Sequence, residues 1–415
     1  MGNYLLTEQN GRTIPLEDKI FGINKLAKEM EATAGKEAVT NATVGSLLND
    51  GGKLVVLSSV VDVLKNLEPV DYADYAPIGG TPEFKKAIQK AAFGNFVPKC
   101  HTAVVATPGG TGAIRNTISN FSKYGDKVLT TDWFWAPYTT IAQEIGRGVD
   151  TFKLFDENGN FNIASFDEKV KELVDAQGRL IIILNTPAHN PTGYSLTLSD
   201  WDNVIASVKA AATGDKKIAI LVDAAYIDFA GDADECRKFL PKLENLPDNI
   251  LPIIAYSLSK TFTLYGMRSG AMICMTQNKD IADEFVRVCE FSSRGSWSNC
   301  PRAAMAVLSR IYDDKALLEK VEKERDEYME MLIRRGKAFE KAAKEAGLAI
   351  VPFDAGFFAS IPCDNPEEIG KELQKEGIFV VPLAKGLRIT VAAIPEEKCV
   401  AIPAKVVAIQ NRLGK

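Results

Sequence analysis

The chain has 415 residues, of which 46% are hydrophobic and 25% are charged, enough for a large core in two or three domains. A formal net charge of −5 argues against a nucleic acid or an anionic membrane as the main partner. We find no apolar stretch near the ~20 residues of a membrane span and no signal peptide within residues 1–31, which also argues against a membrane partner. Two histidines and seven scattered cysteines without a CxxC pair argue against a metal centre and a disulfide framework, so we expect a reducing, cytoplasmic setting.

The middle of the chain alternates short apolar runs with amphipathic segments. The runs predict strands, and the segments between them predict helices. Because the runs lack polar alternation, both faces of each strand should be buried, as in a mainly parallel α/β sheet with helical crossovers. We expect strands at 102–107, 127–131, 180–184, 218–222 and 250–255, and helices at 112–123, 138–144 and 198–212.

The pattern changes near residue 315. A long charged segment over 316–346 has apolar positions at helical spacing, and its charges are typical of a solvated helix face. The rest of the chain predicts a smaller α+β domain. Its expected elements are a strand ending at 361, a helix over 367–376, short strands at 378–381 and 388–391, and a last helix over 404–413.

A lysine, Lys260, follows the strand expected at 250–255. Such a lysine is usually a surface residue, but Arg268 lies eight residues further on. A lysine nucleophile must lose a proton, and both burial and a nearby cation lower its pKa. The Ser257 and Ser259 hydroxyls, together with Arg268, also suit a phosphate group.

Three further segments follow predicted strands. Gly109, Gly110 and Thr111 open a helix whose free N–H groups suit a phosphate, although a simple tight turn fits equally, and the spacing is not that of a dinucleotide site. Asn190 lies in a turn-forming Asn-Pro-Thr-Gly sequence. Asp223 ends an apolar run, so its carboxylate must cap a helix or find a partner such as a protonated ring nitrogen. The carboxyl ends of parallel strands are where α/β sheets place ligand crevices.

In combination, these motifs resemble the class I aminotransferases of the aspartate aminotransferase fold type, fold type I. The resemblance implies a mainly parallel, seven-stranded sheet in a large domain, residues 51–314, that binds pyridoxal 5′-phosphate. It also implies a smaller α+β domain, residues 315–415, against which the N-terminal segment, residues 1–50, packs. The resemblance covers residues 41–391 and rests on PIGG at 77–80, GGTGA at 109–113, AHNPTG at 188–193, VDAAY at 222–226, SLSK at 257–260 and LYGMRSG at 264–270.

The resemblance gives the strand-end residues roles in catalysis. It implies that Lys260 is the Schiff-base lysine that binds the cofactor and then moves a proton as base and acid. Asp223 is implied to pair with the pyridine nitrogen and keep it protonated. Asn190 and Tyr226 are implied to hydrogen-bond the ring hydroxyl, and Asn190 also lies beside the substrate. The implied catalytic set is therefore Lys260, Asp223 and Tyr226.

The resemblance also implies how the rest of the cofactor is held. A phosphate cradle is implied for Gly109, Gly110, Thr111, Ser257 and Arg268. Trp135 is implied to stack on the ring, with Trp133 as the competing choice in the same short stretch. Tyr75 is implied to reach the phosphate from a partner subunit, which makes the active unit a homodimer.

Substrate recognition is implied for three residues. Arg388 matches the arginine that binds the α-carboxylate in a bidentate fork. Gly45 matches the glycine of the N-terminal segment that closes over the substrate. Arg294 matches an arginine donated across the dimer to a side-chain carboxylate. We therefore expect amino transfer between an α-amino acid and a 2-oxo acid, with aspartate or glutamate and 2-oxoglutarate or oxaloacetate as substrates.

Other reactions stay open at this point. Members that accept aromatic amino acids can keep the arginine seen at Arg294, and the same scaffold hosts other fold type I enzymes such as C–S lyases. The sequence also departs from the family pattern. Gly109 stands where close relatives often have a hydroxyl residue, and Tyr138 stands where aspartate-specific relatives have a histidine. Segments 231–249 and 362–366 match no pattern and leave substrate choice open.

Overall fold

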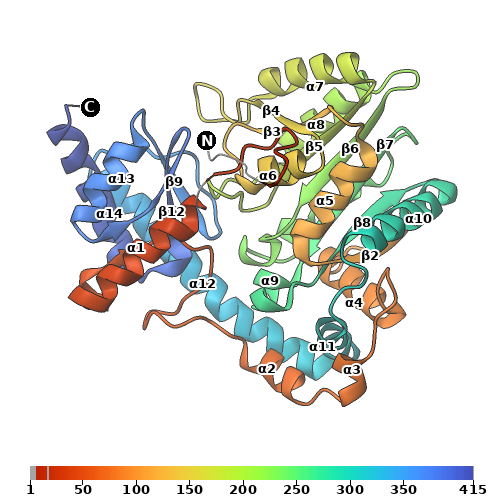
Figure 1. Ribbon diagram of the computed structural model, residues 1–415, viewed down its shortest axis with the longest axis horizontal. Helices are drawn as coiled ribbons and strands as arrows, with labels where there is room; N and C mark the ends of the chain where they lie inside the picture. Colours follow the sequence, from red (N-terminus) through yellow and green to blue (C-terminus); the bar gives the residue numbers. More distant parts are fainter. Residues whose placement is uncertain (1–5, 16–17, 415) are drawn as a thin grey trace.

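The computed structural model describes residues 6–15 and 18–414, and its largest element is a seven-stranded sheet (Figure 1). The strand order is β2-β8-β7-β6-β5-β3-β4, and all strands run in the same direction except β8, which is antiparallel to its neighbours β2 and β7. The predicted α/β fold with a mainly parallel sheet of seven strands is therefore confirmed. The strands are β2 (His101–Thr107), β3 (Lys127–Thr131), β4 (Gly148–Phe152), β5 (Arg179–Asn185), β6 (Lys217–Asp223), β7 (Ile250–Ser257) and β8 (Gly270–Thr276).

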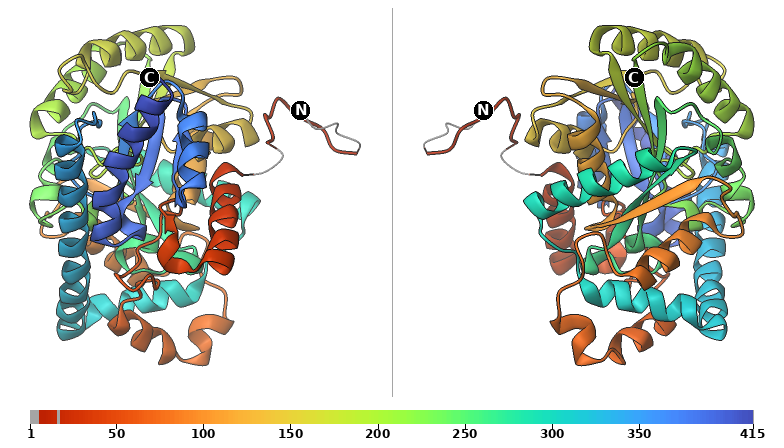
Figure 2. Two further views of the ribbon diagram at one scale, coloured as in Figure 1. Left: turned by 90° about the vertical axis from the view of Figure 1, so that its left-hand side faces the viewer. Right: turned by 90° about the vertical axis from the view of Figure 1, so that its right-hand side faces the viewer.

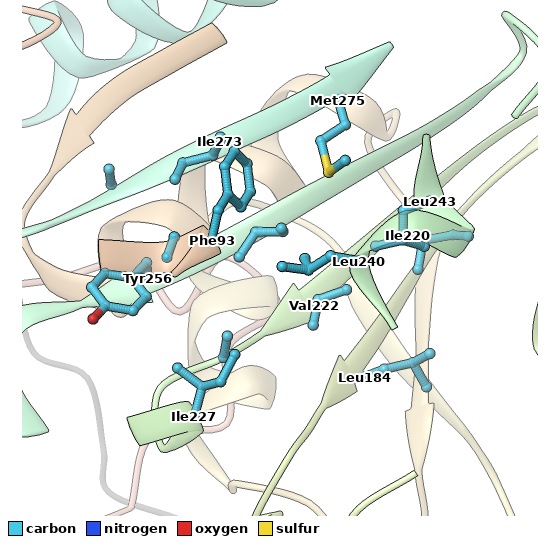
Figure 3. Close-up of a cluster of buried hydrophobic side chains, with 14 of the residues drawn as sticks. Phe93, Leu184, Ile220, Val222, Ile227, Leu240, Leu243, Tyr256, Ile273 and Met275 are labelled. Carbon is cyan, nitrogen blue, oxygen red and sulfur yellow. The ribbon is translucent and has the colours of Figure 1, made fainter. Parts of the chain in front are cut away.

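Helices cover both faces of this sheet, as the continuous apolar runs predicted. Along β5, Ile181 and Ile183 pack with the helices of one face, while Ile182 and Leu184 join the core of the other, part of which Figure 3 shows. One face is covered by α5 (Gly109–Phe121), α6 (Pro137–Glu144) and α10 (Lys279–Ser296). The other is covered by α4 (Pro82–Phe93), α7 (Ile163–Gln177), α8 (Leu198–Ala211) and α11 (Arg302–Asp313).

A smaller α+β part follows the sheet and has a hydrophobic core of its own. Helix α12 (Lys315–Glu345) joins the two, because Val321 lies in the large core and Phe339 in the small one (Figure 1). The small part holds a three-stranded sheet of order β11-β12-β9. Its elements are β9 (Phe358–Pro362), β10 (Ile378–Phe379), β11 (Val381–Leu383), β12 (Gly386–Thr390), α13 (Pro366–Lys375) and α14 (Glu396–Arg412).

The N-terminal segment lies with the small part. Helix α1 (Lys19–Ala34) contacts β10 and β11, and β1 (Thr40–Asn41) pairs in parallel with β10 (Figure 2). Further along, α2 (Ser58–Lys65) and α3 (Pro69–Ala73) pack against α11. The division of the chain into residues 1–50, 51–314 and 315–415 stays a prediction, and residues 1–5 and 16–17 lie outside the described part.

Several elements differ from the sequence-based expectations. Strands β4 and β8 and helix α10 were not foreseen, and β8 is the strand that runs antiparallel. Helix α14 begins at Glu396 and continues through the buried Pro403, whereas we expected its start just after this proline. We expected the helix to start there because proline favours the first turn of a helix. Within residues 6–15 and 18–414, no helix is long and apolar enough to cross a membrane, and no group of acidic, histidine and cysteine side chains could hold a metal.

Candidate active site

The carboxyl ends of β5, β6 and β7 open into a cavity of about 390 Å³ between the large sheet and the small part. Its walls come from residues far apart in the sequence, including the start of α1 and strand β12. The predicted residues that line it are Gly45, Gly110, Thr111, Trp135, Asn190, Asp223, Tyr226, Ser257, Lys260, Arg268 and Arg388.

Lys260 lies in α9 (Leu258–Thr261), a single turn that follows β7. Ser257 caps this turn, with its hydroxyl accepting a hydrogen bond from the Ser259 amide at 3.2 Å. Lys260 is half-buried as a residue, and its amine lies 4.7 Å from the centroid of the Tyr265 ring. Burial, and then the charge of Arg268, lower the pKa of Lys260 to about 8, although Asp223 acts in the opposite direction. The amine can therefore lose its proton near neutral pH, as a nucleophile must.

Asp223 ends β6 and is almost fully buried. The Tyr138 hydroxyl donates a 2.6 Å hydrogen bond to its Oδ2 atom. Burial raises the pKa of Asp223, while the bonds from Tyr138 and from the Ala225 amide lower it in part. The Tyr138 ring also meets the Trp135 ring edge-on, with centroids 5.5 Å apart. The carboxylate is thus supported by a buried phenol.

Asn190 and Tyr226 lie side by side in the cavity wall. The backbone N–H of Asn190 donates to Asn185 Oδ1 at 2.6 Å, and Asn185 Nδ2 donates to the backbone carbonyl of Asp223 at 2.7 Å. Burial raises the pKa of Tyr226, and a side-chain hydrogen bond with Asn190 lowers it in part. Asn190 Oδ1 is buried and has no hydrogen-bond partner among the described residues. A buried acceptor of this kind needs a donor, which a ligand can supply.

Gly109, Gly110 and Thr111 form the first turn of α5, facing Arg268. Gly109 has φ +70°, and a Cβ atom there would lie 3.1 Å from Arg268 Nη2, so glycine suits both the turn and the close approach. Arg268 Nη1 donates to Ser259 Oγ at 3.2 Å. The free N–H groups of the helix start, the hydroxyls and the guanidinium converge here, which is an arrangement that binds a phosphate.

The two tryptophans that competed for the stacking role lie in different places. Trp135 lines the cavity, whereas Trp133 is buried in the main hydrophobic core on the other face of the sheet. The position of Trp135 favours it as the aromatic residue that contacts a bound ring.

Arg388 reaches the cavity from β12 in the small part. Its Nη2 atom donates to the carbonyl of Thr43 at 2.6 Å, and its Cζ atom lies 4.6 Å from the centroid of the Phe358 ring. Its Nε atom is buried without a hydrogen-bond partner in the described part of the chain. Burial lowers the pKa of Arg388 to about 10, so it stays charged at neutral pH. A buried, incompletely paired guanidinium needs an anion. Gly45 lies nearby, and a Cβ atom there would come 2.8 Å from Phe358.

Tyr75 and Arg294 lie outside this chain's own cavity. Tyr75 is 82% exposed, and Arg294 is also exposed. A chain of hydrogen bonds joins their neighbourhoods: Arg294 Nη1 donates to Ser298 Oγ at 2.6 Å, and Asn299 Nδ2 donates to the carbonyl of Ala76 at 2.6 Å. The two predicted partner-reaching residues thus belong to one exposed surface.

Several residues that line the cavity were not among the predicted site residues, including Tyr265, Asn185 and Phe358. Tyr265 lies inside the LYGMRSG motif, which was the available signal for it. Asn185 begins the segment that contains Asn190. Phe358 comes from a strand of the small part, and its sequence surroundings carry no signal for a site.

The cavity can be tested against the group that the resemblance implied. Pyridoxal phosphate carries a phosphate, a ring nitrogen, a ring hydroxyl and an aldehyde. The helix start with Arg268 fits the phosphate, Asp223 fits a protonated ring nitrogen, and Lys260 fits the aldehyde. The unpaired Oδ1 of Asn190 marks a polar gap beside Tyr226, where the ring hydroxyl would lie. The residues present therefore fit this cofactor.

Comparisons with known proteins agree with this arrangement. The model of the family "Aminotransferase class I and II" matches residues 37–402. Aspartate aminotransferase of Escherichia coli (strain K12) is 25% identical over 406 residues, which cover 94% of this chain and 97% of that protein. The aromatic-amino-acid aminotransferase of the same organism is 26% identical over 284 residues, which cover 67% of this chain and 69% of that protein.

Solved structures show the same fold. An aminotransferase from Anaerococcus prevotii is 38% identical, with a TM-score of 0.95, over 98% of this chain and 100% of that one. The cytoplasmic aspartate aminotransferase of Saccharomyces cerevisiae is 20% identical, with a TM-score of 0.80, over 97% of this chain and 98% of that one. An aromatic-amino-acid aminotransferase from Burkholderia pseudomallei, covalently bound to pyridoxal phosphate, is 22% identical, with a TM-score of 0.78, over 97% of this chain and 100% of that one.

Proposed function

This chain belongs to the family of class I and II aminotransferases, and within that family we propose that it acts on dicarboxylic substrates. It is a pyridoxal-phosphate enzyme that transfers amino groups. The proposed pairs are aspartate or glutamate with 2-oxoglutarate or oxaloacetate. The observation that carries this proposal is the exposed Arg294, held on the same surface as Tyr75 and away from its own chain's cavity. An arginine placed there is available to a neighbouring active site.

Different residues of the cavity would hold different parts of the cofactor. When bound, pyridoxal phosphate supplies an aldehyde that takes up the amino group and a ring that accepts electrons. Gly109, Gly110 and Thr111 present N–H groups to its phosphate, and Arg268 and Ser257 add a charge and a hydroxyl. Trp135 covers one face of the ring.

Proton movement falls to Lys260 and its neighbours. The Lys260 amine, with its pKa lowered to about 8, would act as general base and then general acid in the 1,3-shift of a proton from the substrate α-carbon. Asp223, supported by Tyr138, holds a proton on the ring nitrogen. Tyr226 and Asn190 would hydrogen-bond the ring hydroxyl and fix the orientation of the ring.

Substrate binding uses both parts of the chain. Arg388 binds the α-carboxylate in a bidentate fork, and Gly45 lets the N-terminal segment close over it without a clash. We propose that Tyr75 and Arg294 of one subunit complete the site of its partner in a homodimer. Such a dimer would set Arg294 against the side-chain carboxylate of the substrate. We also propose a cytoplasmic setting, which the scattered cysteines without a CxxC pair support.

A half-reaction assay tests the substrate proposal. The holoenzyme is mixed with single amino acids, and the cofactor absorbance is followed as the amino group is transferred. Arg294→Ala should lower kcat/KM for aspartate by roughly two orders of magnitude, since two charge-assisted hydrogen bonds are lost. Arg287→Ala, an exposed arginine on the same helix, is the matched control. Unchanged aspartate turnover in Arg294→Ala would refute the dicarboxylate assignment.

Subunit mixing tests the shared site. Lys260→Ala and Arg294→Ala homodimers should both fail to turn over aspartate. Mixed dimers carry one site with both residues intact, so an equal mixture should recover roughly a quarter of the wild-type sites. No recovery after verified subunit exchange would show that Arg294 does not act across a dimer.

The alternative substrate class is aromatic amino acids. It is favoured by the aromatic-amino-acid and tyrosine aminotransferases among the relatives. Tyrosine and phenylalanine in the same half-reaction assay decide the matter. If they react faster than aspartate and are insensitive to Arg294→Ala, the enzyme prefers the aromatic class.

A further inference from the structure

The segment over 231–249, which matched no pattern in the sequence, contains a buried arginine that contacts Asp228 near the active site. Arg237, in the short helix η3 (Glu235–Arg237), is only 4% exposed. Its guanidinium donates to the carbonyls of Ala91 and Ala92 at 2.9 and 3.1 Å, at the end of α4. Its Nη2 atom also donates to Asp228 Oδ1 at 2.6 Å. Arg237 thus adds polar contacts to a segment whose Phe239, Leu240 and Leu243 are already buried in the core.

Asp228 is the centre of this cluster and is itself 6% exposed. Its Oδ2 atom accepts hydrogen bonds from the Tyr256 hydroxyl at 2.7 Å and from Thr261 Oγ1 at 2.8 Å. The buried Arg325 of α12 is a second cation close by. Burial alone would raise the pKa of Asp228, but Arg237 and Arg325 lower it to about 2. Other titratable groups that face the cluster are Tyr312 and Glu322, from α11 and α12.

The position of Asp228 in the chain connects the cluster to two segments of the proposed active site. Asp228 lies in η2 (Ile227–Phe229), two residues after Tyr226. Its hydrogen-bond partner Thr261 follows Lys260 directly. One carboxylate therefore connects the segments that carry two groups proposed to contact the cofactor. Burying such a charge costs free energy, so stability alone is a poor reason for it.

We propose that Asp228 is a positioning residue that, through Thr261, fixes the turn carrying Lys260 at the cofactor aldehyde. This inference rests on the proposed role of Lys260. The ionised carboxylate holds Thr261 from one side while Arg237 holds the carboxylate from the other. The α9 helix is a single turn of four residues, and a fixed external partner restricts the positions open to its lysine.

Two forms of the cofactor separate positioning from general packing. Pyridoxal phosphate has an aldehyde that can bond to Lys260, whereas pyridoxamine phosphate has none. Thr261→Val removes the hydroxyl but keeps the shape, and Thr261→Ser restores the hydroxyl. Thr130→Val, at a buried threonine of β3 that donates to the carbonyl of Ile183, is the matched control. Dissociation constants for both cofactors are measured on each purified, cofactor-depleted protein.

Thr261→Val should weaken pyridoxal phosphate binding by roughly fivefold to tenfold, the size of one lost hydrogen bond, and leave pyridoxamine phosphate within roughly twofold. Thr261→Ser should restore wild-type binding, Thr130→Val should change neither constant, and Asp228→Asn should repeat the Thr261→Val pattern. Equal weakening of both cofactors, or of neither, would overturn the inference. Lys260→Ala serves as the reference: if it too fails to distinguish the two cofactors, the proposed role of Lys260 is wrong, and the inference falls with it.

Discussion

Replacing Lys260 by methionine should stabilise the cofactor-free protein. The Lys260 amine has a pKa of about 8 in the folded chain, well below its ordinary value of 10.5, because burial and the charge of Arg268 disfavour the ammonium form. At neutral pH the folded chain without cofactor must still carry this ammonium group. Methionine has a similar length and no charge, so Lys260→Met removes the cost.

The magnitude and its pH dependence follow from these two pKa values. The interval between about 8 and 10.5 corresponds to about 3 kcal/mol, at 1.36 kcal/mol per pH unit. Below pH 8, Lys260 is charged in both the folded and the unfolded chain, so the folded wild type bears the full cost. As the pH rises from 8 to 10.5 the folded chain loses this proton before the unfolded one, and the cost disappears. The gain of Lys260→Met should therefore be complete at pH 7 and largely absent at pH 10.5.

The measurement is the free energy of unfolding of cofactor-depleted protein in urea at several pH values. Lys209→Met, at an exposed position of α8, is the control and should change stability by less than about 0.5 kcal/mol at any pH. A difference between Lys260→Met and wild type that does not vary with pH would refute the reasoning. It would mean that the amine is not desolvated in the folded chain.

Three further predictions concern the same cavity. Arg388→Lys should raise KM for the amino acid by roughly 100-fold, because the bidentate fork is lost, while the dissociation constant of pyridoxal phosphate stays unchanged; steady-state kinetics and cofactor titration check this. Gly109→Ala should weaken cofactor binding by roughly tenfold, because of backbone strain at φ +70° and contact with Arg268. If the variant and the wild type bind the cofactor with equal affinity, the proposed phosphate cradle is wrong. Tyr138→Phe should lower the unfolding free energy of cofactor-free protein by ~1.5–3 kcal/mol at neutral pH and by less in acid, because a protonated Asp223 needs no charge-assisted bond. An equal loss of unfolding free energy in acid would show that the Tyr138–Asp223 bond is not the reason for the change.

The sequence predicted the residues that parallel strands bring together. Lys260, Asp223 and Asn190 each follow an apolar run, and the carboxyl ends of parallel strands meet at one sheet edge. Local patterns were sufficient for these residues, because the strand supplies the position and the following turn supplies the polar group. Even the choice between Trp135 and Trp133 needed only the direction of two side chains, which the structure supplies.

Long-range contacts were not readable in the same way. Arg237 sits in a loop-like segment where an arginine is usually exposed, and only the tertiary structure brings it against Asp228 and the end of α4. Phe358 likewise reaches the cavity from the small part, on a strand whose register cannot be inferred from its own residues. Strand β8 carries an apolar run like those of its neighbours and could have been predicted, but nothing in that composition indicates that it runs antiparallel to them.

The charges of the cavity connect substrate choice to assembly. Among the described residues that line it, the cations are Lys260, Arg268 and Arg388. In the proposed site, Lys260 serves the aldehyde, Arg268 the phosphate and Arg388 the α-carboxylate, a group that every amino acid carries. A second carboxylate in this cavity would then lie in a low-dielectric site without a cation, which is costly. A preference for dicarboxylic substrates therefore requires a positive charge from outside the chain's own cavity. Arg294 of a partner subunit can supply that charge, so a variant that cannot dimerise should lose the preference for aspartate along with the shared site.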